Sequence, residues 1–160
     1  MIRRPPRSTL DRSSAASDVY KRQLHVSGRV GEDIFYQVQG NILFSERVMY
    51  DAALAFTKVH GTLADRVMAA MEAADDAGGD SRCTCEREPK PTAACDGKTS
   101  HVAYIAIADR DDALGTSHND GDYYAYISVT DEDIASDENA NPVKTLRLRY
   151  DTWKAQEGLR

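Results

Sequence analysis

Three cysteines in the polar segment 80–100 are the residues of this sequence whose types most directly suggest chemistry. Cys83, Cys85 and Cys95 form a Cys-x-Cys…Cys pattern, and His101 follows. These four side chains could bind zinc, but zinc sites favour two to four residues between paired cysteines, and His101 begins an apolar run. A disulfide that closes the loop, Cys85–Cys95 or Cys83–Cys95, fits the spacing better, and three reduced thiols are the remaining alternative. A disulfide would favour a secreted or otherwise extracytoplasmic protein.

Five polar side chains beside the predicted strands could line a substrate cleft: Gln39, Asn41, Asp80, Asn119 and Asp120. The two amides could donate hydrogen bonds to a substrate carbonyl or a developing oxyanion, and Asp80 could orient a substrate amine. Each residue also has a structural interpretation. Gly40 and Asn41 could form a bulge in which Gln39 pairs through its backbone, Asp80 could close a loop or pair with Arg82, and Asn119 and Asp120 are common turn formers.

The segment 118–122 resembles an oxygen-rich calcium loop, but it lacks the full alternation of ligands and the distal bidentate glutamate. The sequence contains no glycine-rich phosphate loop, no serine elbow and no His-Glu-x-x-His motif. We therefore expect no metal site and no cofactor.

Hydrophobic periodicity predicts a strand and two helices in the first half of the chain. The β-branched and aromatic run 34–39 indicates a strand that bends at Gly40. Ser45 is the predicted N-cap of a helix to about His60, whose buried stripe would be Val48, Ala52, Ala55 and Val59, with Met49 and Phe56 beside it. Thr62 and Asp65 predict a second capped helix that ends at Gly78–Gly79 and buries Leu63, Val67, Met71 and Ala74.

The second half alternates polar loops with apolar runs. Residues 101–108 are almost continuously apolar, which predicts a strand covered on both faces, and residues 123–129 predict another strand. Asn141 followed by Pro142 predicts the start of a helix whose apolar face is Val143, Leu146, Tyr150 and Trp153. The order strand, helix, helix, strand, strand, helix predicts a layered α+β domain.

Composition excludes several classes of protein. The chain has 160 residues, enough for one domain, and a net charge of −6, which argues against a nucleic-acid partner. No apolar run approaches the roughly 18 residues of a membrane span, so we expect no membrane partner. Self-association into a homo-oligomer stays open.

Residues 1–23 differ from the rest of the chain. They carry six basic and two acidic residues and show neither a helical nor a strand period. The strings RRPPRSTL and SSAASDVYKRQ resemble translated sequencing-adapter DNA. We therefore expect 1–23 to be an artefactual or disordered tail, 24–160 to be the domain, and an unknown length of the natural N-terminus to be missing.

The domain also resembles a known family. Its signature is Tyr36-Gln37-Val38-Gln39-Gly40-Asn41-Ile42-Leu43 before a helix, a second helix ending Ala77-Gly78-Gly79-Asp80, His118-Asn119-Asp120 before a strand, and Asn141-Pro142-Val143. Together these motifs resemble the C-terminal part of domain of unknown function 1028, over about residues 27–156. Relative to the commoner family pattern, the cysteines lie in an insertion.

This family in turn resembles the N-terminal-nucleophile (Ntn) hydrolases. The resemblance implies a partial αββα sandwich, truncated at its N-terminal side. In such enzymes an N-terminal Thr, Ser or Cys attacks an amide carbonyl, with its own α-amine as the base. The resemblance therefore implies an amide-bond hydrolase for a small amide or peptide-like substrate, and because the nucleophile would precede this chain, we expect the chain itself to be inactive. The alternative is a non-catalytic, secreted binding or structural domain with the same sandwich.

Overall fold

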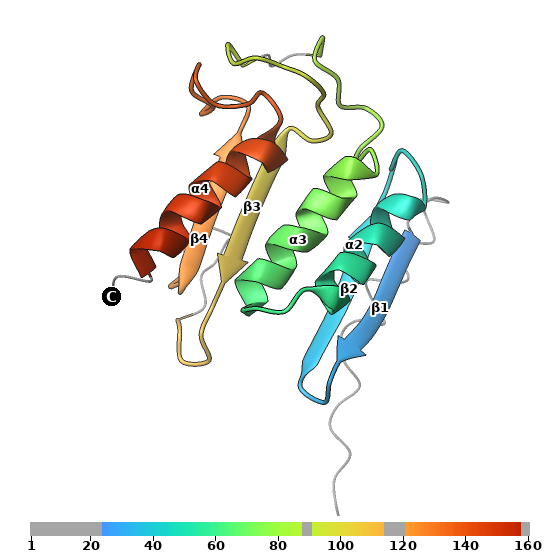
Figure 1. The fold of residues 1–160 in the computed structure, drawn as a ribbon, viewed down its shortest axis with the longest axis vertical. Helices are drawn as coiled ribbons and strands as arrows, with labels where there is room; N and C mark the ends of the chain where they lie inside the picture. Colours follow the sequence, from blue (N-terminus) through green and yellow to red (C-terminus); the bar gives the residue numbers. More distant parts are fainter. Residues whose placement is uncertain (1–23, 88–90, 114–120, 158–160) are drawn as a thin grey trace, which may run out of the picture.

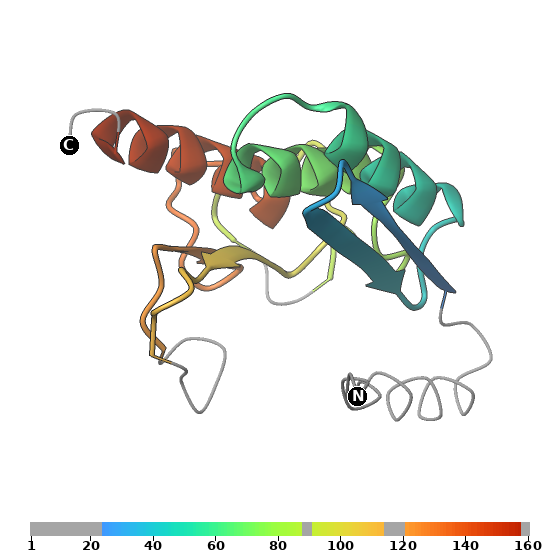
Figure 2. The same ribbon diagram turned by 90° about the horizontal axis from the view of Figure 1, so that it is seen from below.

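Two β-hairpins and three helices form the described part of the chain. The computed structural model describes residues 24–87, 91–113 and 121–157. Their elements are, in chain order, β1 (Leu24–Val30), β2 (Ile34–Gly40), α2 (Arg47–Lys58), α3 (Leu63–Asp76), β3 (Val102–Ile107), β4 (Ala125–Thr130) and α4 (Pro142–Glu157). The helices form one layer and the hairpins a second layer beneath it (Figures 1 and 2). The predicted α+β class is confirmed.

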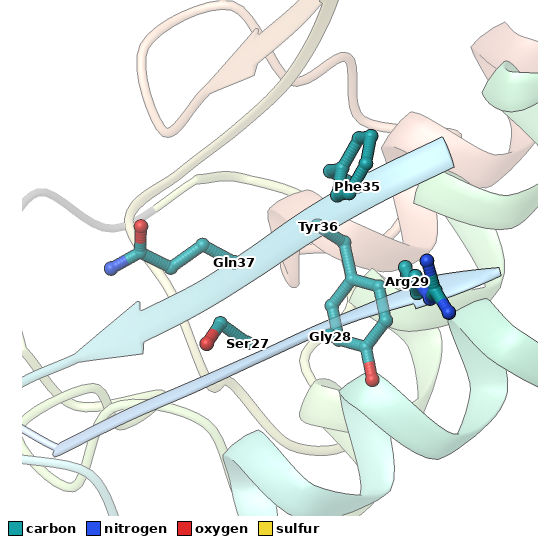
Figure 3. A pocket seen from close by; sticks show the side chains of 6 residues that line it. All are labelled: Ser27, Gly28, Arg29, Phe35, Tyr36 and Gln37. Atoms are coloured by element: carbon teal, nitrogen blue, oxygen red, sulfur yellow. The ribbon is translucent and has the colours of Figure 1, made fainter. Parts of the chain in front are cut away.

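The first hairpin contains a strand that sequence periodicity missed. β1 pairs antiparallel with β2, from Leu24 opposite Gly40 to Val30 opposite Ile34. A Ser-Gly pair in the middle of β1 weakens its strand signal. Packing explains the glycine at position 28, because a β-carbon on Gly28 would lie 2.5 Å from the Tyr36 hydroxyl oxygen. Figure 3 shows the Tyr36 ring beside Gly28.

The two central helices begin in different ways. α2 starts after Glu46, which makes no side-chain capping bond, so the predicted cap at Ser45 is wrong. By contrast, Thr62 and Asp65 form the predicted reciprocal capping box of α3. α2 covers the first hairpin, where the rings of Tyr36 and Phe56 are 5.2 Å apart.

The buried faces of these helices differ in part from the prediction. α2 buries Val48, Met49, Ala52, Ala53 and Phe56, whereas Ala55 and Val59 are only partly buried. α3 buries Ala64 and Met68, with Val67 and Met71 packed beside them. Leu63 is 48% exposed, so its predicted burial is wrong: the first residue of α3 lies at the open end of the helix layer.

The second hairpin is covered on one face only. β3 and β4 pair antiparallel, with Val102 opposite Thr130 and Ile107 opposite Ala125. Ile105 and Val129 point into the core with Met68, Leu146 and Tyr150, while Val102 and Tyr104 are 53% and 46% exposed. The expected cover on both faces is therefore wrong in this structure, because the described helices lie on a single side of the hairpins (Figure 2).

The last helix begins as predicted. The Asn141 side-chain oxygen accepts the Val143 N–H at 3.2 Å, and Pro142 is the first residue of α4. The Asn141 amide also donates to Asp75 of α3 at 2.7 Å, which ties the start of α4 to the end of α3. Within the described ranges, no helix combines the length and apolar character needed to cross a membrane.

Candidate functional site

Three segments that are distant in sequence meet at the end of the layers where β2 and α3 finish and β3 begins, uppermost in Figure 1. The Phe44 N–H donates to the Gly79 carbonyl at 2.9 Å, and the Ser81 N–H donates to the Ile42 carbonyl at 3.0 Å. The Asp80 N–H donates to the Thr99 carbonyl at 2.9 Å. The turn after α3 therefore joins the extension of β2 to the segment that precedes β3.

The double glycine makes this junction possible. Gly78 and Gly79 have φ angles of 101° and 50°, values that a residue with a side chain rarely adopts. A β-carbon on Gly79 would lie 2.6 Å from the Thr99 carbonyl oxygen. Glycine at this position thus allows two backbones to approach and fixes where Asp80 lies.

Gln39 and Asn41 lie on and beyond the outer end of β2. Gln39 is paired opposite His25 and is exposed, on the sheet face that points away from α2. Asn41 is exposed in the bend that follows, where Ile42 has a φ of 53°. Ile42 and Leu43 contact the Asp80–Ser81 backbone, so the structure brings the Asn41 and Asp80 segments together.

Asp80 is bound to its neighbour Arg82. Its two carboxylate oxygens accept the Arg82 Nε and Nη2 groups at 2.9 and 2.5 Å, and the Arg82 backbone N–H adds a third bond. These bonds, together with the nearby His101, hold the pKa of the Asp80 carboxyl below its usual value, against the opposing effect of burial. The carboxylate is ionised at neutral pH, and the local pairing that the sequence suggested is present.

A second group of polar side chains lies at the same end and was not predicted from the sequence. Asp131 Oδ2 lies 2.5 Å from His101 Nδ1 and 2.8 Å from Lys98 Nζ. The side chains of Lys98 and Asp131 are each 2% exposed, and that of His101 is 30% exposed. Asp131 Oδ1 is buried without a hydrogen-bond partner. An imidazole held by a buried carboxylate and reaching the surface is suited to proton transfer.

The register of the second hairpin is the signal that could have revealed this group. Val102 is opposite Thr130, so the next pair along is His101 with Asp131. The Asp131 N–H donates to the His101 carbonyl at 3.2 Å, which extends the pairing by one residue. Each residue is ordinary in sequence, and their proximity follows only from the pairing.

The structure selects one of the two disulfides that the spacing allowed. Cys85 and Cys95 are bonded, with 5.9 Å between their α-carbons, while Cys83 is free and buried. Burial raises the pKa of the Cys83 thiol, so it is not an activated nucleophile. In the residues that the structure describes, no cluster of three or more His, Cys, Asp or Glu side chains could hold a metal ion. The candidates Asn119 and Asp120 lie outside the described residues.

Among the described residues, cavities are found away from this polar end. One, of about 610 Å³ and open to solvent, is on the first hairpin between Ser27, Arg29, Phe35 and Gln37 (Figure 3). The other, of about 520 Å³, is at the opposite end of the layers, between the start of α3 and the last turns of α4. Neither cavity is lined by Asp80 or His101.

Comparison with known protein families gives a match to the first half of the chain. Residues 13–90 match the model of a family of unknown function (DUF1028). The match starts within the segment 1–23 and ends between Cys85 and Cys95, so it covers the first hairpin, α2, α3 and the Asp80 turn. The adapter origin of residues 1–23 stays a prediction. No curated protein and no solved structure matches the chain.

Proposed function

We propose, on the premise that residues 13–90 belong to the family of unknown function DUF1028, that this chain forms one α/β half of an Ntn-type amide-bond hydrolase. Its substrate would be a small amide or peptide-like molecule. The nucleophile would come from a strand outside the described residues. The polar end around Asp80, Asn41 and His101 would contact the substrate.

The two separate hairpins are the observation that carries this proposal. β1–β2 and β3–β4 lie in one layer under the helices, yet each is a sheet of only two strands. Two-stranded sheets are marginally stable alone, and each strand here has an edge without a partner in the described sheets. Further strands that pair with these edges would complete a sheet of the kind that an αββα sandwich requires.

The side chains at the polar end support amide chemistry. Asp80 is an ionised carboxylate that could hold a substrate amine, and Asn41 offers an amide donor in the neighbouring bend. His101, oriented by Asp131, could donate a proton to the departing amine. The raised pKa of Cys83 argues against that thiol as the nucleophile, in agreement with a nucleophile from elsewhere.

The test begins with the natural gene. Long-read sequencing upstream of the codon for Leu24 should reveal an in-frame strand that begins with Thr, Ser or Cys after a removable leader. The complete protein should then release p-nitroaniline from a panel of aminoacyl anilides, and alanine at the nucleophile should abolish this turnover. Asp80→Asn should raise KM more than it lowers kcat. A gene that truly encodes residues 1–23, or a complete protein without turnover, would overturn the proposal.

The disulfide favours a second candidate, a non-catalytic secreted domain that binds a ligand. Disulfides persist in oxidising compartments, and neither Cys85 nor Cys95 belongs to the buried core cluster. This candidate predicts a bulky apolar residue at the mature N-terminus and no turnover in the complete protein. N-terminal sequencing of the secreted protein separates the two candidates.

A further inference from the structure

The face of the first hairpin that points away from α2 carries four exposed side chains that line one cavity. Ser27 and Arg29 belong to β1, and Phe35 and Gln37 belong to β2. They share a face because successive side chains of a strand point to opposite sides of the sheet. The cavity has a volume of about 610 Å³ and is open to solvent. Its size is that of a small-molecule site.

The register of the hairpin arranges these side chains in two facing pairs. Arg29 is opposite Phe35, and Ser27 is opposite Gln37. The β-carbons of directly opposed residues are about 4.5–5.5 Å apart in an antiparallel pair. Figure 3 shows Arg29 and Phe35 toward one end of the hairpin, with Ser27 and Gln37 further along the strands. A single small ligand can therefore contact the guanidinium and the phenyl ring together.

The Arg29 guanidinium is not engaged by other side chains. Within residues 24–87, 91–113 and 121–157, the Arg29 side chain forms no ion pair and no hydrogen bond. Glu32 and Asp33 carry the nearest carboxylates along the chain, and neither of them lines the cavity. Arg147, by contrast, pairs with two carboxylates. The N–H groups of Arg29 are therefore available to a ligand.

The polar groups of the cavity are mainly hydrogen-bond donors. A guanidinium has five N–H donors and no acceptor, and the Gln37 amide and Ser27 hydroxyl add further donors. No acidic residue is among the described residues that line the cavity, so Arg29 gives it a positive charge although the chain as a whole has a net charge of −6. The planar fork of a guanidinium matches the two oxygens of a carboxylate. These donors therefore favour an anionic ligand, and one guanidinium balances the single charge of a carboxylate.

The Phe35 ring favours an apolar group on the same ligand. Phe35 is 74% exposed, on a face whose other cavity-lining side chains are polar. An apolar group packed against this ring would remove the surfaces of both from water, and a second aromatic ring would add a favourable ring contact. An inorganic anion would leave Phe35 exposed, and a phosphate would bring more charge than one guanidinium balances.

We propose that this cavity is a binding site for a small organic carboxylate that carries an apolar group. The carboxylate would accept hydrogen bonds from Arg29, and the apolar group would lie against Phe35. Ser27 and Gln37 would donate hydrogen bonds to further oxygens of the ligand. The proposal does not depend on the hydrolase proposal, because none of these residues belongs to the polar end around Asp80 and its test measures binding without turnover.

The test is a titration of the full, ¹⁵N-labelled chain with sodium 3-phenylpropionate at pH 7 and constant ionic strength, followed by the amide chemical shifts. 3-Phenylpropan-1-ol keeps the ring without the charge, and acetate keeps the charge without the ring. We expect saturable shifts centred on residues 27–29 and 35–37, with a Kd on the order of 1 mM. Each control compound should bind more weakly by about fivefold or more.

Variants locate the site. Arg29→Gln should weaken binding by about tenfold or more, and Arg29→Lys, which keeps the charge but not the fork, should give an intermediate loss. Phe35→Ala should weaken it by about threefold to fivefold. Arg110→Gln is the matched control, because it removes an exposed guanidinium that lines neither cavity, and it should change the Kd by less than about twofold.

The substituted positions are exposed, so the amide spectrum of each variant should show that its fold is retained. Absence of saturable shifts in the first hairpin would overturn the proposal. Equal binding of the alcohol or of acetate would do so as well, as would an equal loss of affinity in Arg29→Gln and Arg110→Gln.

Discussion

The imidazole of His101 and the carboxylate of Asp131 face each other across the open end of the second hairpin, with 2.5 Å between Nδ1 and Oδ2. The same carboxylate oxygen pairs with the buried Lys98 ammonium. A buried carboxylate that pairs with a buried ammonium is strongly constrained, because removal of either group takes a partner away from a charge that is out of water. We therefore expect Asp131 to be sensitive to substitution.

Asp131→Asn should lower the free energy of unfolding by about 3–5 kcal/mol, because the buried Lys98 ammonium would lose the carboxylate that lies 2.8 Å from it. The matched control is Asp133→Asn, whose carboxylate pairs with Arg149 at the surface with 45% of its side chain exposed. That change should cost about 1 kcal/mol or less. Urea denaturation measures both, and equal losses would contradict the assignment.

Gly79→Ala should cost more stability than Gly31→Ala, although both glycines have a positive φ. At Gly31 the added β-carbon meets nothing within 4 Å, so only the backbone conformation is penalised, by about 1 kcal/mol. At Gly79 it also collides with the Thr99 carbonyl, which should raise the total to roughly 2–4 kcal/mol. Thermal unfolding measures both losses of stability. Equal losses in the two variants would show that the backbone around Gly79 and Thr99 can move to accommodate the added β-carbon.

Thr62→Ala should destabilise the protein by about 1 kcal/mol because it removes the side chain that caps α3. Ser45→Ala is the corresponding change before α2, where no side-chain capping bond exists, and it should cost less than about 0.5 kcal/mol. Chemical denaturation of both variants measures the difference. If Ser45→Ala were the costlier change, α2 would be capped as its sequence suggested.

Non-reducing peptide mapping should find Cys85 linked to Cys95 and Cys83 as a free thiol. Because burial raises the pKa of the Cys83 thiol, iodoacetamide should modify it slowly until urea unfolds the chain. Replacing Cys85 and Cys95 together by serine should lower stability by about 2–3 kcal/mol. A Cys83–Cys95 crosslink in the native protein would refute this pairing.

Protonation of Asp65 should account for part of the stability that the protein loses at acid pH. Lys154 lowers its pKa in the folded state, so its contribution is complete above the unfolded pKa of about 3.9 and is lost as pH falls below that value. Asp65→Asn keeps an oxygen for the Thr62 cap but removes the titrating charge. Between pH 5 and 2.5 the variant should lose about 1 kcal/mol less than the wild type in urea melts. Parallel pH profiles would contradict the prediction.

Features that depend on a few neighbouring residues could be predicted from the sequence. The capping box of Thr62 and Asp65, the double glycine after α3, and Asn141 before Pro142 each satisfy backbone groups within one helical turn. The type of element they start or end therefore hardly depends on the rest of the fold. The cysteine spacing likewise favoured a disulfide and suggested two pairings, of which the structure contains Cys85–Cys95.

Features that depend on which segments lie side by side could be decided only by the tertiary structure. β1 carries a weak strand signal and becomes a strand because β2 pairs with it. The apolar run of β3 suggested burial on both faces, yet Tyr104 is exposed because the described helices cover one face. The Lys98–Asp131–His101 group likewise needs the pairing of Val102 with Thr130. Sequence determines local hydrogen bonding and periodicity, whereas long-range pairing and layer packing determine which side chains share a site.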